Sequence, residues 1–141
     1  MNREIEALND NDTYTLSELP KGRTAVGGRW VYAIKSCPGK EDKFKARFVA
    51  KGYNQKKDLD YTDTFSPTAR MTSVRLLMQL AINNGNVVHQ MDVCTAYLNA
   101  EVDHEIYVEQ PPGFVKSNKN GPKLYCKLKK SLYGLKQSGR M

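Results

Sequence analysis

Asp92 ends an apolar run and has the setting of a metal ligand. The run 87–93 is typical of a buried strand, and small residues and then the aromatic Tyr97 follow it. A carboxylate there is a hard oxygen ligand for a divalent cation, small residues let backbone N–H groups approach a phosphate, and an aromatic ring can wall a sugar pocket. This combination indicates nucleotidyl transfer, although a lone aspartate after a strand is also a common turn or cap residue.

Lys45 and Arg47 are the cations best placed to hold phosphate. They are two residues apart in the alternating run 44–51 and so lie on the same face of the predicted strand. The planar fork of arginine pairs with phosphate oxygens. Residues 21–57 carry eleven Lys or Arg against two acids, and the net charge of the chain is +7. Such a balance favours nucleic acid first and an anionic membrane second. No apolar run approaches the ~20 residues of a membrane span.

The sequence predicts both helices and strands around these residues, and therefore an α+β fold. The chain has 141 residues, so it holds at most one ordinary domain. Alternating runs at 29–35 and 44–51 predict a hairpin around the turn 37–40. Further strands are expected at 13–19, 87–93, 104–110 and 124–128, with short helices near Ile5 and Leu8 and from Ser131 onward.

A helix is predicted over 72–84. Thr72 or Ser73 is suited to cap its start, and Gly85 is suited to end it. Its apolar residues recur at helical spacing, which is more typical of core packing than of a cofactor site. These residues are Val74, Leu77, Met78 and Ala81.

The ordered blocks of the chain resemble the reverse transcriptase of copia-type retrotransposons. One block reads Ser131-Leu132-Tyr133-Gly134-Leu135-Lys136-Gln137, and another surrounds Asp92. Together the blocks cover nearly the whole chain at 28–32, 44–55, 60–67, 89–98, 106–114 and 124–137. The resemblance implies a fingers hairpin plus an incomplete palm. Residues 1–86 would be fingers-like and 87–141 the first part of the palm, truncated before the family's Tyr-x-Asp-Asp hairpin.

The function implied by the resemblance is RNA-directed DNA polymerisation within a Pol polyprotein. Two Mg²⁺ or Mn²⁺ ions would clamp the attacking and leaving oxygens. The sequence contains no Asp-Asp pair, so the chain alone is expected to be inactive. A non-catalytic basic module that binds nucleic acid and a decayed transposon remnant are the alternatives.

The resemblance also assigns the site residues. Asp92 would be the catalytic metal ligand, Lys45 and Arg47 would hold the β- and γ-phosphates, and Tyr97 would press on the sugar and favour dNTP. The family often has Asn and Phe where this chain has Thr95 and Tyr97. The other nucleotide-binding positions would be the backbone near Cys94, Thr95 and Ala96, and the segment that carries Tyr133, Gly134 and Lys136.

The partners implied are an RNA or DNA template–primer, dNTP and the remainder of the Pol polyprotein, with no membrane. The expected location is intracellular, in a cytoplasmic virus-like particle, with a nuclear stage left open. Three cysteines far apart in the sequence fit neither a disulfide framework nor a zinc site.

Overall fold

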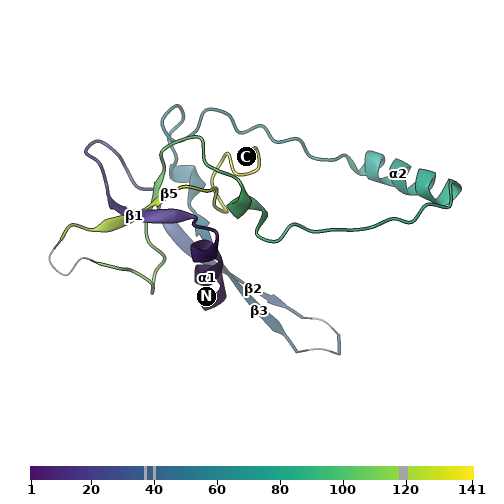
Figure 1. Ribbon diagram of the computed structural model, residues 1–141, viewed down its shortest axis with the longest axis horizontal. Coiled ribbons are helices and arrows are strands. Elements are labelled where there is room, and N and C mark those ends of the chain that lie inside the picture. The colour runs from purple at the N-terminus through teal and green to yellow at the C-terminus, as the bar shows by residue number, and fades with distance from the viewer. Residues whose placement is uncertain (37, 40, 118–120) are drawn as a thin grey trace.

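Two small antiparallel sheets, two α-helices and two 3-10 helices make up the described part of the molecule (Figure 1). The computed structural model describes residues 1–36, 38–39, 41–117 and 121–141. The predicted mixture of helices and strands is confirmed. The elements are α1 (Asn2–Asp10), β1 (Tyr14–Glu18), β2 (Gly28–Lys35), β3 (Lys43–Ala50), the 3-10 helix η1 (Gly52–Asn54), α2 (Met71–Asn83), the 3-10 helix η2 (Ala96–Asn99), β4 (Tyr107–Val108) and β5 (Leu124–Leu128).

The hairpin of β2 and β3 confirms the sequence prediction. The strands pair antiparallel from Gly28 opposite Ala50 to Lys35 opposite Lys43. At the base of the hairpin, Trp30 packs edge to face on Phe48 with ring centroids 5.7 Å apart. The far half projects from the molecule with its side chains exposed (Figure 1). Two residues of the predicted turn, 37 and 40, lie outside the described residues.

The three-stranded sheet pairs a strand from the N-terminal part of the chain with strands from its C-terminal part. Its order is β1-β5-β4, and β1 pairs antiparallel with β5 from Tyr14 opposite Leu128. The predicted strand at 104–110 forms only as the two residues of β4. The strands on either side of residue 86 therefore share one sheet, and the division into fingers and palm stays a prediction.

The core lies where α1, the base of the hairpin and this sheet meet. Burial of Cys126 raises the pKa of its thiol to about 12, so this cysteine behaves as a small apolar core residue. The buried cluster consists of Leu8, Val26, Phe48, Ala50, Leu98, Ile106, Val108, Cys126, Leu128, Leu132 and Leu135.

Helix α2 forms where the sequence predicts it and ends before Gly85, but its predicted packing and N-terminal cap are wrong. It lies at the far end of two long connections, away from the rest of the molecule (Figure 1). None of its residues is buried, and Leu77 and Met78 are 67% and 52% exposed. Arg70 is the N-cap residue, so neither Thr72 nor Ser73 caps the helix. Helical spacing shows that the apolar residues share a face, but it does not identify what covers that face.

Two other predicted elements are wrong. Residues 87–93 are extended but form no strand, because none of the described residues supplies a hydrogen-bonding neighbour to this stretch. The segment from Ser131 makes successive turns in place of a helix. Gly134 has φ +91° there, a conformation that cannot continue a right-handed helix. Within the described part of the chain, no helix is long and apolar enough to cross a membrane.

Candidate nucleotide site

Strand β3 places Lys45 and Arg47 on one face of the hairpin. Their register partners on β2 are Ala33 and Val31, which are small enough to leave both cations uncovered by the neighbouring strand. The strands of the hairpin carry cations and no acid in the sequences Gly28–Lys35 and Lys43–Ala50. One acid lies near the pair, Glu4 of α1, whose Oε1 accepts the backbone N–H of Phe48 at 3.2 Å. Cations still outnumber acids around Lys45 and Arg47, which favours an anionic ligand.

Arg47, Tyr133 and Tyr97 form a continuous stack. The guanidinium carbon of Arg47 lies 4.8 Å from the centroid of the Tyr133 ring. Tyr133 in turn meets Tyr97 edge to face, with centroids 4.6 Å apart and an interplanar angle of 85°. Both contacts are favourable, since a cation is attracted to the ring face and aromatic pairs prefer edge-to-face geometry. The stack joins a predicted phosphate-binding residue to the predicted sugar-contacting residue.

The backbone of Tyr133 and Gly134 is held directly against the end of β3. The amide of Ala50 donates to the carbonyl oxygen of Tyr133 at 2.8 Å. A Cβ atom on Gly134 would lie 2.2 Å from the carbonyl oxygen of Ala50, and one on Gly52 would lie 2.1 Å from the carbonyl oxygen of Gly134. Only glycine at both positions permits this approach of the two backbones.

Lys45 also lines a cleft of about 930 Å³ together with Cys94 and Thr95. The cleft lies between α1, the hairpin and the turn before η2. Its wall also carries three further cations, Arg3, Lys35 and Lys43, and one acid, Glu4. Thr95 has φ +50° and ψ +41°, and this left-handed residue reverses the chain into η2. The structure thus brings three of the predicted nucleotide-binding residues to one cleft and places Tyr97 on the helical turn that follows.

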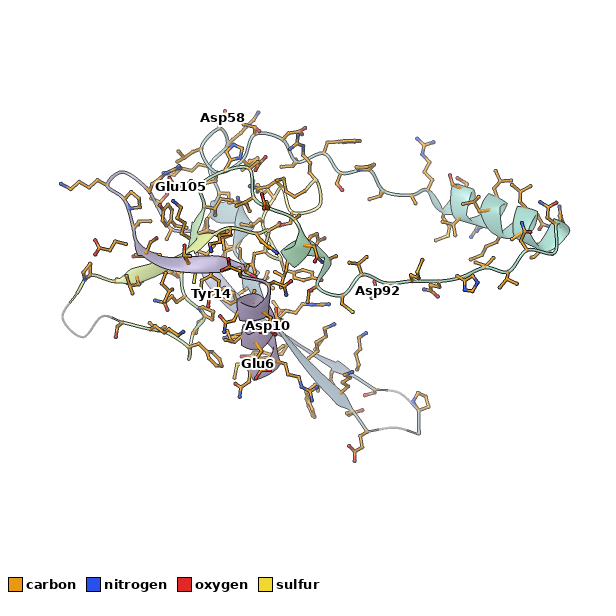
Figure 2. All side chains as sticks on the ribbon, in the orientation of Figure 1. Glu6, Asp10, Tyr14, Asp58, Asp92 and Glu105 are labelled. Carbon is orange, nitrogen blue, oxygen red and sulfur yellow. The ribbon has the colours of Figure 1, made fainter. Side chains whose placement is uncertain are left out.

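Asp92 lies apart from these side chains. It is exposed, on the extended stretch that returns from α2 to η2 (Figure 2). The prediction that it ends a strand is wrong because residues 87–93 are unpaired with any described strand. An exposed carboxylate is a suitable ligand for a hard divalent cation, but two such ions need more than one carboxylate. No group of three or more metal-ligating side chains occurs among the described residues.

Lys136 and Gly134 are not part of the stack of Arg47, Tyr133 and Tyr97. The ammonium of Lys136 lies over the ring of Tyr61, 5.1 Å from its centroid, and donates to the Tyr61 hydroxyl at 3.3 Å. Gly134 serves the backbone contact with β3. Ala96 begins η2, beside the cleft residue Thr95.

A buried amide pair behind this site was not predicted from the sequence. Gln55 and Gln137 are 6% and 0% exposed, and their side chains are hydrogen bonded at 3.0 Å. Both glutamines fall inside resemblance blocks, but a polar residue in a polar loop carries no signal of burial. Because 82 positions separate them, no local pattern could have paired them.

The comparisons with known proteins agree with the resemblance. A family model described as "Reverse transcriptase (RNA-dependent DNA polymerase)" matches residues 11–141. The chain is 46% identical over 143 residues to "Retrovirus-related Pol polyprotein from transposon TNT 1-94" of Nicotiana tabacum, a match that covers 99% of this chain and 10% of that protein. It is 42% identical over 142 residues to the corresponding polyprotein from transposon RE1 of Arabidopsis thaliana, with the same coverage of 99% and 10%.

A more distant relative is found in yeast. The chain is 38% identical over 100 residues to "Transposon Ty1-H Gag-Pol polyprotein" of Saccharomyces cerevisiae, over 67% of this chain and 5% of that protein. The chain spans about a tenth of the length of the plant relatives. No solved structure matches it.

Proposed function

Because the chain belongs to the reverse transcriptase (RNA-dependent DNA polymerase) family, in the branch of copia-type retrotransposon Pol polyproteins, we propose that it supplies the nucleotide-contacting part of such a polymerase. The substrate is dNTP, and the nucleic acid partner is an RNA or DNA template–primer. The family match favours this function over a non-catalytic module or a decayed remnant.

The observation that carries the proposal is the Arg47–Tyr133–Tyr97 stack beside the cleft of Lys45 and Thr95. Two cations on one strand face offer fixed positive charge to the β- and γ-phosphates, and the arginine fork makes paired hydrogen bonds to their oxygens. Tyr97, at the other end of the stack, presses on the sugar where a ribose carries its 2′-hydroxyl. Phosphate and sugar contacts are thus supplied from a single packed unit.

Asp92 is assigned to metal binding in this proposal. A divalent cation, Mg²⁺ or Mn²⁺, supplies charge stabilisation of the attacking and leaving oxygens when bound. The chain contributes one carboxylate, and backbone N–H groups near Cys94, Thr95 and Ala96 contribute to phosphate binding. Tyr133, Gly134 and Lys136 line the side of the incoming nucleotide and template strand. Catalysis belongs to a polypeptide that contains this chain and further carboxylates, because the sequence has no Asp-Asp pair.

The test is a polymerase in which this chain is extended through a Tyr-x-Asp-Asp hairpin and the following domains. Asp92→Asn removes a metal ligand without changing size, so primer extension is expected to fall by at least about a thousandfold while primer–template affinity is kept. Asp58→Asn is the matched control, since Asp58 is exposed in a separate loop and its φ of +64° suits asparagine (Figure 2). Full activity of Asp92→Asn contradicts the assignment, as does primer extension by the 141-residue chain alone.

A further inference from the structure

The buried pair Gln55 and Gln137 joins the segment after β3 to the segment that carries Tyr133. The Nε2 group of Gln55 donates to Oε1 of Gln137 at 3.0 Å, and Oε1 of Gln55 accepts the backbone N–H of Lys136 at 2.8 Å. Nε2 of Gln137 donates to the carbonyl oxygen of Asp60 at 2.8 Å. The two side chains thus form one chain of hydrogen bonds between the two segments.

The backbone groups at both ends determine the orientation of these amides. The Lys136 N–H is a donor, so the Gln55 atom that faces it must be the oxygen. The Asp60 carbonyl is an acceptor, so the Gln137 atom that faces it must be the nitrogen. The remaining nitrogen of Gln55 then faces the remaining oxygen of Gln137. Every group in this buried chain has a partner, and removing either side chain leaves others without one.

The amide pair provides one of the attachments that flank Gly134. The first is the hydrogen bond from the Ala50 amide to the Tyr133 carbonyl at 2.8 Å. The second is the bond from Lys136 to Gln55, with Gln137 next in the chain. Between these two points the backbone adopts the left-handed conformation of Gly134, which aims the preceding ring at Arg47. With the second attachment lost, the backbone after Gly134 loses its buried hydrogen bond to Gln55 and keeps the exposed contact of the Lys136 side chain with Tyr61.

We propose that Gln55 and Gln137 are positioning residues for sugar selection. They hold the ring of Tyr133 between Arg47 and Tyr97, and so fix the wall that Tyr97 presents to the nucleotide. Both side chains are buried, at 6% and 0% exposed, and the role proposed for them acts through Tyr133. The inference rests on the proposed function for the roles of Arg47 and Tyr97, whereas the attachment itself is measurable without any activity.

The kinetic test uses the extended polymerase with Gln55→Met, Gln137→Met and the double variant. Methionine has similar length and no amide, so the hydrogen bonds are lost while volume is nearly kept. The preference for dNTP over rNTP, measured as the ratio of kcat/KM values, is expected to fall about tenfold in each single variant, as for a small displacement of a substrate-positioning group. The double variant is expected to match the singles, because either change breaks the same chain.

Gln110→Met is the matched control. Gln110 is also buried, at 7% exposed, and its amide makes hydrogen bonds of 2.8, 2.9 and 2.8 Å to the backbone of Lys116 and Leu124. These bonds lie between the loop after β4 and β5, and none reaches Tyr133. The control variant is therefore expected to lose stability and keep the wild-type preference for dNTP.

Amide hydrogen exchange in the same proteins measures the attachment directly. The Ala50 N–H, which bonds to Tyr133, is expected to exchange at least about tenfold faster in Gln137→Met, because its partner segment opens more often. The Lys51 N–H, which bonds to Gly27, is expected to keep its rate and serves as the internal reference.

The outcomes separate the two proposals. Wild-type sugar preference in folded Gln55→Met and Gln137→Met overturns the positioning role, and so does an equal loss of preference in Gln110→Met. Unchanged Ala50 exchange overturns the attachment itself, whether or not the polymerase is active. An inactive wild-type polymerase with accelerated Ala50 exchange in Gln137→Met refutes the proposed function and supports the attachment.

Discussion

The guanidinium of Arg47 lies over the ring of Tyr133, 4.8 Å from its centroid, although the two residues are far apart in the sequence. Arg47 comes from a regular strand, whereas Tyr133 comes from a turn that is held to the end of that strand by backbone contact. The contact with the Tyr133 ring explains how the side chain of Arg47, on an exposed hairpin, is held in one orientation. Its consequences are open to direct measurement.

Replacing Tyr97 tests the sugar wall in the extended polymerase. Tyr97→Ala is expected to keep primer extension with dNTP and to raise incorporation of rNTP by about tenfold or more, because the ring that excludes the 2′-hydroxyl is gone. Steady-state kinetics with matched dNTP and rNTP measure this. Tyr97→Phe is the control, since it keeps the edge-to-face contact with Tyr133, and it should retain the wild-type preference. If Tyr97→Ala still rejects rNTP, the ring is structural only.

The basic hairpin predicts salt-dependent binding of nucleic acid by the 141-residue chain. Replacing Lys45, Arg47 and Lys51 together by alanine should weaken binding of a single-stranded oligonucleotide. It should also reduce the slope of log affinity against log salt by about 2 to 3. Each phosphate contact that is lost means that fewer counterions are released on binding. Fluorescence anisotropy over a salt series measures both quantities.

The control for that triple variant removes equal charge elsewhere. It replaces three lysines that each form an ion pair with an acid, namely Lys123 with Glu109, Lys127 with Glu105 and Lys129 with Asp12. We expect a smaller loss of affinity from it, because paired lysines offer less charge to phosphate. Equal losses in the two triple variants would show that only net charge matters, and would remove the hairpin from the binding surface.

Substitution of two glycines distinguishes the cost of backbone strain from the cost of a steric clash. Gly113 and Gly134 both have positive φ, at +86° and +91°, but only a Cβ on Gly134 would meet a backbone atom, the Ala50 oxygen at 2.2 Å. Gly113→Ala should cost about 1–3 kcal/mol of unfolding free energy from strain alone. Gly134→Ala should cost about 1–3 kcal/mol more from the clash. Urea denaturation of both variants measures the difference, and equal costs would contradict the close backbone approach.

Protonation of Glu105 is expected to account for part of the pH dependence of stability. The hydrogen bond from Lys127, then that from the Tyr107 hydroxyl, holds the pKa of Glu105 below its ordinary value of 4.5 (Figure 2). A carboxylate with a lowered folded-state pKa contributes stability that is present above about pH 4.5 and is lost as pH falls through the folded-state value.

The measurement is thermal unfolding of the chain from pH 7 to pH 3. Glu105→Gln should lower the melting temperature at neutral pH and flatten the decline on the acid side, because there is no longer a carboxylate to protonate. Glu6→Gln, on the exposed surface of α1, reports the general effect of removing a surface carboxylate. An undiminished acid decline in Glu105→Gln would show that the ion pair with Lys127 does not contribute.

The sequence by itself determined the family, the chemical identity of the site residues and the elements that depend on local pattern. The hairpin of β2 and β3 follows from alternation in two neighbouring runs, and α2 follows from helical spacing, because both form hydrogen bonds within a short stretch of chain. Lys45 and Arg47 share a face for the same reason. Their assignment to phosphate stays a prediction, as does that of Asp92 to metal.

Only the tertiary structure decided which distant segments meet. The run 87–93 has the composition of a strand, but pairing requires a neighbour that composition cannot name, and none of the described strands provides one. The burial of Gln55 against Gln137, and the approach of Gly134 to Ala50, join residues about eighty positions apart. Such contacts depend on the packing of the whole chain, because the free energy of a buried hydrogen bond or a close backbone contact exists only after both segments are in place.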